Sequence, residues 1–241
     1  GKIHVWKSET GFGGMSIVDD RIYVVQHGIG LMEVKGDSLE LIPGGEKVVC
    51  SIEFMIPVSK SDADKKILIG TVSCGLFWYD GIDCIPLEGD AAYVIKELKI
   101  NSGSLLADGT IAIATQNCGI IIFDPAGGGN IRNVINKSSG LKDDIVNYLF
   151  IDKGKGLWAA HNSGITRLEV PSPITFFDEP HGLRGSPNAF LRYKNTLYIG
   201  TDIGLFYLNL SLKDFPGDAQ YIGRNIKLQQ PQFKPVAGLK D

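Results

Sequence analysis

The chain has 241 residues, of which 44% are hydrophobic and 21% charged, a composition typical of a folded globular protein and not of a disordered one. Its net charge of −3 provides no basic surface, so we expect no nucleic-acid partner. No apolar run reaches the roughly 18 residues that a membrane-spanning helix needs, so we expect no membrane contact by this segment.

One pattern recurs five times along the chain: an apolar run, a polar or small step, a glycine and a second apolar run. It occupies residues 21–34, 66–80, 110–124, 156–170 and 196–210. The aligned glycines are separated by 45, 44, 45 and 40 residues, and they are Gly30, Gly75, Gly119, Gly164 and Gly204. The pattern predicts a β-hairpin whose second strand begins at the glycine.

The first run of each hairpin is almost continuously apolar, as in a strand that is buried on both faces. We therefore expect its large side chains to be buried, namely Ile67, Leu68, Ile69, Ile113, Trp158, Tyr198 and Ile199.

A further strand is predicted on each side of every hairpin. The preceding strands are expected at 14–19, 50–58, 102–108, 144–152 and 187–193. The following strands are expected at 38–44, 83–89, 130–136, 174–179 and 219–224. Four antiparallel strands in about 45 residues are the unit of a β-propeller blade, and no helical period of 3.6 residues competes with this interpretation.

The sequence thus predicts an all-β chain that forms a single β-propeller over residues 1–241, with an irregular β-sandwich as the alternative. Its five blades are expected at about 13–44, 45–89, 95–136, 140–179 and 182–224. The sequence "GLKD" that begins the fourth blade returns at 238–241, and 2–12 resembles the outer strand of another blade. We therefore expect partial blades at both ends, a longer parent propeller, and self-association through the terminal blades.

The fourth repeat carries a recognisable motif. Its matching residues are Gly140, Leu141, Val146, Phe150, Asp152, Gly156, Leu157, Trp158, Gly164 and Ile165. With these residues the chain resembles the two-component regulator propeller repeat, although it has Ala159-Ala160-His161 where that family usually has Ile-Gly-Thr. The resemblance implies the periplasmic or extracellular sensor region of a bacterial hybrid histidine kinase, whose well-known members recognise saccharides. Any kinase activity would then belong to attached domains.

No residue pattern predicts catalysis. The histidines His4, His27, His161 and His181 lie in different repeats or linkers, away from any nucleophile or carboxylate pair. Asp152 in "IDKGKGLW" is interpreted as a turn residue that caps backbone amides. The four cysteines have no metal-binding spacing, and we expect free thiols, including Cys74 and Cys118 at equivalent positions. We predict no enzyme activity, no metal and no cofactor.

The candidate binding surface is the end of the propeller where the second-to-third-strand turns and the blade-crossing loops emerge. The turns supply His27, Ser73, Asn117, His161, Asn162 and Asp202, and the crossing loops supply Phe12, Asp143, His181 and Arg184. Such groups suit a small-molecule ligand, with an oligosaccharide as the first hypothesis. The alternatives are a scaffold for protein–protein interaction and a propeller hydrolase or lyase.

Overall fold

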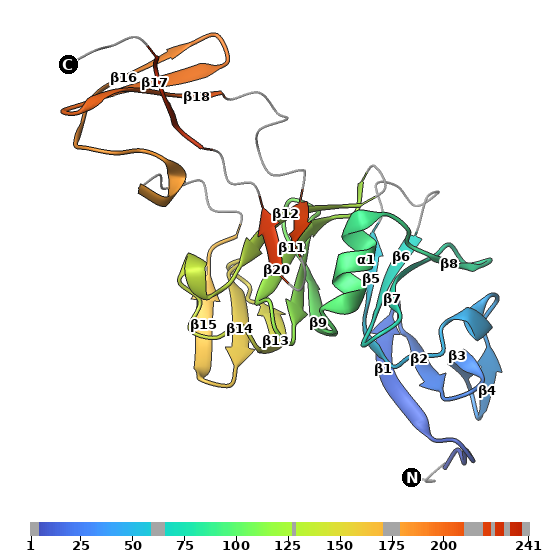
Figure 1. The fold of residues 1–241 in the computed structure, drawn as a ribbon. Helices are drawn as coiled ribbons and strands as arrows, with labels where there is room; N and C mark the ends of the chain where they lie inside the picture. The colour runs from blue at the N-terminus through green and yellow to red at the C-terminus, as the bar shows by residue number, and fades with distance from the viewer. Residues whose placement is uncertain are drawn as a thin grey trace. The chain divides into compact units, whose positions relative to one another are not determined.

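The computed structural model describes residues 5–58, 66–126, 129–170, 179–209, 219–222, 225–228 and 232–237. The chain divides into two compact units, Gly1–Pro171 and Ser172–Asp241, and each unit is described by itself. Figure 1 follows the four sheets of the first unit from blue through yellow.

All four sheets of the first unit are antiparallel and are built from strands that follow one another in the chain. The first sheet contains β1 (Phe12–Val18), β2 (Arg21–Gln26), β3 (Gly30–Lys35) and β4 (Ser38–Leu41). The second contains β5 (Ile52–Val58), β6 (Lys66–Thr71), β7 (Gly75–Tyr79) and β8 (Cys84–Pro86). The third contains β9 (Ile100–Leu105), β10 (Ile111–Thr115), β11 (Ile120–Asp124) and β12 (Asn130–Ile135). The fourth contains β13 (Val146–Ile151), β14 (Leu157–His161) and β15 (Gly164–Leu168).

The second unit contains a fifth sheet and a separate hairpin. The fifth sheet consists of β16 (Pro187–Tyr193), β17 (Thr196–Thr201), β18 (Gly204–Asn209) and β21 (Lys234–Pro235). The hairpin consists of β19 (Ala219–Ile222) and β20 (Asn225–Leu228). The expectation of a fourth strand at 219–224 was therefore wrong, because β19 pairs with β20 while β21 pairs with β18.

The all-β expectation is confirmed, and the predicted order of four strands is confirmed in the first three sheets. Of the predicted fourth strand of the fourth sheet, at 174–179, residues 174–178 lie outside the described residues. Of the predicted N-terminal strand at 2–12, residues 5–11 form no strand. There the indole Nε1 of Trp6 instead donates a hydrogen bond of 3.0 Å to the backbone oxygen of Asp37 in the first sheet. Residues 238–241, with the second "GLKD", lie outside the described residues.

The repeated glycines stand where the hairpins turn. Gly30, Gly75, Gly164 and Gly204 are the first residues of β3, β7, β15 and β18, and Gly119 directly precedes β11. All five have a positive φ. At Gly30, with φ of 133°, a Cβ would also overlap the backbone of Gly45, so the close approach excludes any larger residue.

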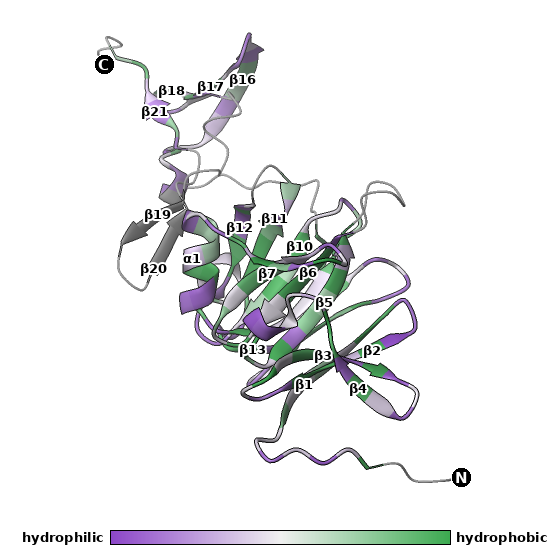
Figure 2. Cartoon of the chain, turned by 90° about the vertical axis from the view of Figure 1, so that its right-hand side faces the viewer, coloured by the Kyte–Doolittle hydropathy of each residue, from purple (hydrophilic) through white to green (hydrophobic). Residues whose placement is uncertain are grey.

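The apolar core lies between successive sheets. One cluster joins Val25 and Leu31 of the first sheet to Ile52 and Ile69 of the second, and another joins the third sheet to the fourth. In the third sheet, every residue of β10 is buried, and Figure 2 colours this strand and β11 largely hydrophobic. Within the first unit, successive sheets thus pack face to face, as the continuous apolar runs predicted.

The predicted buried residues divide into two groups. Ile67, Leu68, Ile69 and Ile113 are buried, as expected. Trp158 is only half-buried, and so are Tyr198 and Ile199 on β17. The expectation that Trp158 is buried was wrong, because its indole N–H donates a hydrogen bond to the carboxylate of Asp152 and the ring is therefore not enclosed in the apolar core.

The helix α1 (Asp90–Glu97) was not predicted. It follows β8 and precedes β9, and it buries Ala92 and Ile95, three residues apart on one face. Eight residues are too few to show a helical period, although Asp90 in the first turn and Lys96 in the last are typical helix signals. Short 3₁₀ turns occur at η1 (Gly45–Lys47), η4 (Lys137–Ser139) and η5 (Glu179–His181).

Candidate functional site

A repeated irregularity in the first strand of each sheet builds the candidate site. In the second sheet, Ile52 pairs with Thr71 and Phe54 pairs with Gly70, so that Glu53 has no partner across the ladder. This is a β-bulge, which re-aims a side chain and often lies beside a binding site. A corresponding irregularity occurs near the start of β1, β9, β13 and β16.

Equivalent bulges place polar side chains at equivalent positions in neighbouring sheets. Asn101 in β9 and Asn147 in β13 occupy the place that Glu53 occupies in β5. Because β9 lies beside both β5 and β13, these three side chains come from adjacent strands. The three bulge residues together with Gln116 and Ile145 line one pocket of about 370 Å³.

The pocket amides are held by hydrogen bonds within the protein. Nδ2 of Asn101 donates to the backbone oxygen of Val146 over 2.9 Å, and Nε2 of Gln116 donates to Oδ1 of Asn101 over 3.1 Å. Nδ2 of Asn147 donates to Oδ1 of Asn162 over 2.9 Å. The network ties the third sheet to the fourth, so the pocket is preorganised.

Glu53 differs from the amides that surround it. Its carboxylate makes no hydrogen bond or ion pair with any residue that the structure describes. The side chain is half-buried, and this burial raises the pKa of the Glu53 carboxyl above its ordinary value. An unpaired, partly desolvated carboxylate in a pocket is an acceptor available to a ligand.

The turns and the crossing loops, which were predicted to emerge at the same end, are hydrogen-bonded to each other in every sheet that the structure describes. In each sheet the turn between the second and third strands bonds to the segment that enters the first strand. The pairs are His27 with Gly11, Val72 with Ser51, Gln116 with Lys99, Ser163 with Asp143, and Asp202 with Ser186. The predicted residue Asn117 directly follows Gln116 in the turn of the third sheet, but only Gln116 lines the pocket.

None of the ten residues predicted from the sequence lines this pocket. Asn162 reaches it through Asn147, and Asp143 bonds to Ser163 in the same sheet. His161 is buried, and its Nε2 lies 2.9 Å from Oγ1 of Thr166.

The remaining predicted residues occupy separate sheets. Phe12 begins β1, and His27 lies in the β2–β3 turn of the first sheet. Ser73 and Asn117 are exposed in the equivalent turns of the second and third sheets. His181, Arg184 and Asp202 belong to the second unit. Their part in ligand binding stays a prediction.

The sequence did contain a signal for the site. Each first strand has a polar or glycine residue directly after its first apolar or proline residue, and in three adjacent sheets this residue is Glu53, Asn101 or Asn147. Strand alternation predicts that this polar side chain points to the face opposite its apolar neighbours. The sequence does not predict the bulge, and the bulge changes the direction of the side chain.

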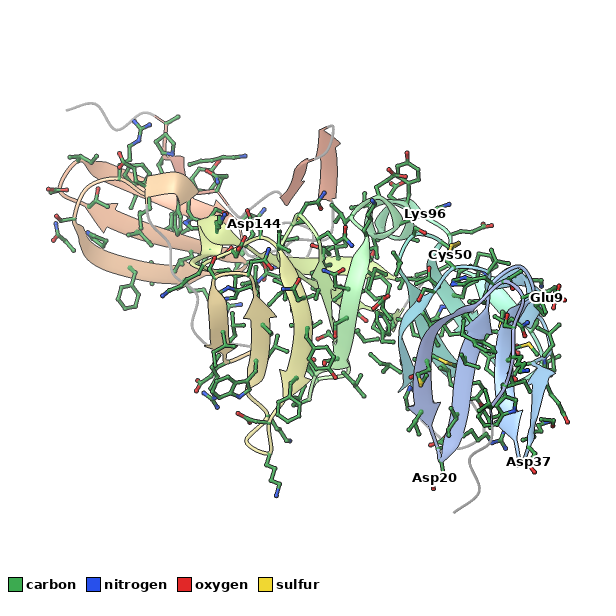
Figure 3. All side chains as sticks on the ribbon, turned by 90° about the horizontal axis from the view of Figure 1, so that it is seen from below. Glu9, Asp20, Asp37, Cys50, Lys96 and Asp144 are labelled. Carbon is green, nitrogen blue, oxygen red and sulfur yellow. A yellow bond between two sulfur atoms is a disulfide. The ribbon has the colours of Figure 1, made fainter. Side chains whose placement is uncertain are left out.

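A disulfide joins the entrance of the second sheet's first strand to the turn between its second and third strands. Cys50, which is labelled in Figure 3, lies just before β5 and bonds to Cys74 in the β6–β7 turn, with 5.8 Å between their Cα atoms. The expectation that Cys74 is a free thiol was therefore wrong. Its partner lies within the same sheet and not at Cys118 of the neighbouring one, because a turn and the strand entrance beside it approach closely. Cys84 and Cys118 are free thiols.

Asp152 has the structural role that was predicted. Its Oδ1 accepts a hydrogen bond of 2.9 Å from the backbone N–H of Gly156, as in a turn cap. Its Oδ2 accepts from Nε1 of Trp158 over 2.7 Å and from Nε of Arg167 over 3.2 Å. These contacts, that of Trp158 first, lower the pKa of Asp152 to about 2.

Within the described ranges, no group of three or more His, Cys, Asp or Glu residues could hold a metal ion. In that same part of the chain, no helix is long and apolar enough to span a membrane.

Comparison with known proteins gives likeness of fold only. No protein-family model matches the sequence, and no curated protein matches it. Among solved structures, the chain is similar to the extracellular domain of BT3049 from B. thetaiotaomicron, which is described as that of a hybrid two-component system. The identity is 18% and the TM-score 0.49, and the match covers 78% of this chain and 26% of that one.

Two further solved structures are similar. The extracellular domain of BT4673 from the same organism, described there as a one-component system, shows 18% identity and a TM-score of 0.49, with 86% of this chain and 28% of that one covered. Virginiamycin B lyase from Staphylococcus aureus shows 13% identity and a TM-score of 0.42, with 98% of this chain and 74% of that one covered. The chain thus spans about a quarter of the length of the first two neighbours.

Proposed function

We propose that this chain is a non-catalytic, ligand-sensing part of a β-propeller, and that it binds a small hydroxyl-rich ligand, a saccharide, in the pocket of the first unit. The observation that carries the proposal is the repeated bulge, through which three adjacent sheets direct Glu53, Asn101 and Asn147 to one pocket. Amide and carboxylate groups form the hydrogen bonds that sugar hydroxyls require, and a preorganised site lowers the entropic cost of binding.

The signalling setting of the proposal comes from the repeat motif of the fourth sheet. Its resemblance to the two-component regulator propeller repeat favours a sensor region whose output domains lie elsewhere in the protein. The disulfide between Cys50 and Cys74 supports a location outside the cytoplasm, because disulfides persist in oxidising compartments and are rare in reducing ones.

The lining of the pocket favours binding over catalysis. Hydrolysis of a glycoside ordinarily needs two carboxyl groups, and nucleophilic catalysis needs a nucleophile beside a base. Glu53 is the one carboxylate among the lining residues, and its companions are three amides and Ile145. We therefore propose that this chain binds its ligand and releases it unchanged.

The proposal can be tested by titrating the ¹⁵N-labelled protein with small saccharides: glucose, galactose, xylose and their disaccharides. The side-chain NH₂ resonances of Asn101, Gln116 and Asn147 should shift together during the titration. Gln116→Ala and Asn147→Ala should each weaken binding by about tenfold, the value of one hydrogen bond of about 1.4 kcal/mol. Asn130→Ala is the matched control, because Asn130 is exposed on β12 and does not line the pocket.

Two results would count against this function. If no saccharide shifts the three amides, the pocket does not bind this class of ligand. If saccharides bind but Asn117→Ala or Ser73→Ala weakens binding while the pocket variants do not, the turns form the site instead.

Self-association is a second property that we propose for the isolated chain, and it is compatible with a role as a protein-interaction scaffold. The first sheet exposes an apolar face, with Met15 72%, Ile17 70%, Ile22 40% and Leu41 43% exposed. Ile17 lies directly opposite Ile22 in the ladder, so these side chains share one face. Sedimentation of Ile17→Ser beside the wild type tests this self-association, and we expect the variant to show the lower molecular mass. An equal molecular mass for both proteins would show that this face does not bind a second copy.

A further inference from the structure

We propose that the ligand of this pocket carries a protonated amine, as an amino sugar does, and that this ammonium group binds the carboxylate of Glu53. The inference rests on the proposed function and names the chemical class of the ligand more closely. It follows from the directions in which the pocket amides point and from the charge of the lining.

The orientation of Gln116 follows from a chain of hydrogen bonds that begins at a backbone carbonyl. The oxygen of Val146 can only accept, so the group of Asn101 that faces it must be the NH₂. Oδ1 of Asn101 therefore faces Gln116, and the NH₂ of Gln116 must donate to it. This leaves Oε1 of Gln116 as an acceptor without a partner among the residues that the structure describes.

The free groups of the pocket are thus rich in acceptors. Both oxygens of Glu53 and Oε1 of Gln116 have no partner in the described part of the chain, while each pocket amide already donates one N–H to the protein. A neutral hydroxyl could satisfy one such acceptor, but an ammonium group offers three donors at once.

The charge of the lining points the same way. Glu53 is the one charged residue that lines the pocket, and no lysine or arginine faces it there. A partly desolvated carboxylate without a cation is costly, and a bound cation compensates for it through charge-assisted hydrogen bonds that are about twice as strong as neutral ones. A ligand carboxylate or sulfate would be repelled at this place.

Burial raises the pKa of the Glu53 carboxyl, and this gives binding a pH dependence with a definite sign. The ammonium form binds the ionised carboxylate, so affinity should fall as the pH drops through the raised pKa of Glu53. Binding of a neutral sugar should change much less over the same range, because its hydroxyls can donate a hydrogen bond to the carboxylate or accept one from the protonated carboxyl.

The test compares D-glucosamine with D-glucose, and D-galactosamine with D-galactose, by calorimetry on the full chain at neutral pH. Each pair differs only in an amine that replaces one hydroxyl. We expect the amino sugar to bind about tenfold more tightly than its neutral partner, as for a hydrogen bond to a charged group compared with a neutral one. Glu53→Gln should remove this preference, so that the amino sugar binds the variant no more tightly than its neutral partner does. Glu88→Gln is the matched control, because Glu88 is exposed near the second sheet and does not line the pocket.

Three outcomes separate this inference from the function on which it rests. If neutral sugars bind as tightly as amino sugars, the inference is wrong while the saccharide site stands. If Glu53→Gln leaves the preference for the amine unchanged, another group binds the ammonium and the inference is also wrong. If no sugar of either kind binds, the proposed function fails together with it.

Discussion

The indole Nε1 of Trp158 and the carboxylate Oδ2 of Asp152 lie 2.7 Å apart, in a hydrogen bond that crosses the hairpin between β13 and β14. The guanidinium of Arg167, from β15, reaches the same oxygen and also stands 6.0 Å from the centre of the indole ring. One carboxylate in the β13–β14 turn thus connects the three described strands of the fourth sheet.

This carboxylate should make the protein sensitive to acid. Because the pKa of Asp152 is lowered to about 2 in the folded protein and is about 3.9 in an unfolded chain, its stabilising effect is complete above about pH 4. The effect is lost as the pH falls towards 2. Asp152→Asn should therefore reduce stability at pH 5 and have much less effect at pH 2.5, as measured by urea unfolding. Asp20→Asn, in an exposed turn, is the control, and an equal loss at both pH values would contradict the assignment.

The second sheet should not tolerate a methyl group at Gly70. A Cβ at this position would overlap the ring of Phe54, which is 6% exposed and also fills the space beside Gly103 in the next sheet. We expect Gly70→Ala to destabilise the protein by roughly 1–3 kcal/mol, the usual cost of overpacking a core. Gly200→Ala changes the equivalent residue of the fifth sheet, where the nearest atom would be Cβ of Ala189 at 3.8 Å. Denaturant unfolding should show a loss only for Gly70→Ala.

The four cysteines should divide into two classes in a labelling experiment, two buried free thiols and two in a disulfide. Burial raises the pKa of Cys84 to about 12 and that of Cys118 to about 11, so both thiols should react slowly in the native protein. After denaturation without a reductant, two of the four cysteines should be alkylated, and all four after reduction. Mass spectrometry counts the labels, and four labels without a reductant would show that Cys50 and Cys74 are not bonded.

Loss of the disulfide should also lower stability. Cys50 and Cys74 are 24 residues apart, and closure of a loop of that size stabilises a fold by about 3 kcal/mol on the chain-entropy estimate. Cys74→Ser should therefore lower the free energy of unfolding, whereas addition of a reductant to this variant should have no further effect. A stability unchanged from the wild type would contradict the estimate.

His161 stands where three other sheets have a threonine that closes the turn. In the fifth sheet, Oγ1 of Thr201 donates to the backbone oxygen of Gly204 over 3.0 Å and accepts from the N–H of Ile203. Thr71 and Thr115 make the same pair of contacts, whereas Nδ1 of His161 is buried with no hydrogen-bond partner in the described structure.

Replacement of this histidine should therefore stabilise the chain. The turn after His161 has the same length as the turn after Thr201, so His161→Thr should form the missing contacts and remove an unsatisfied nitrogen. We expect a gain on the order of 1 kcal/mol in urea unfolding. His161→Val is the control, since it removes the nitrogen but cannot close the turn, and an equal gain from both would show that the turn contacts contribute nothing.

The repeat of hairpins could be predicted from the sequence because its determinants are local. Gly30 and Gly164 adopt the positive φ that a tight turn needs, and the apolar run at 111–114 favours a buried strand. Both preferences depend on residue type and on neighbours in the sequence. The turn role of Asp152 was equally readable, because a carboxylate that caps amides within five residues needs no distant partner. The all-β class, the strand order of three sheets and the position of the turns therefore followed from residue types and spacing alone.

The tertiary structure alone decided which distant residues meet. A bulge turns Glu53 out of the ladder, and the neighbouring strand brings Asn101 beside it, although 48 positions separate the two in the chain. Tertiary packing also decided that Cys50 pairs with Cys74. It likewise decided that β21, and not the predicted strand at 219–224, pairs with β18 in the fifth sheet. Backbone conformation is a property of neighbours in sequence, whereas a pocket is formed by residues whose closeness comes only from the packing of sheet against sheet.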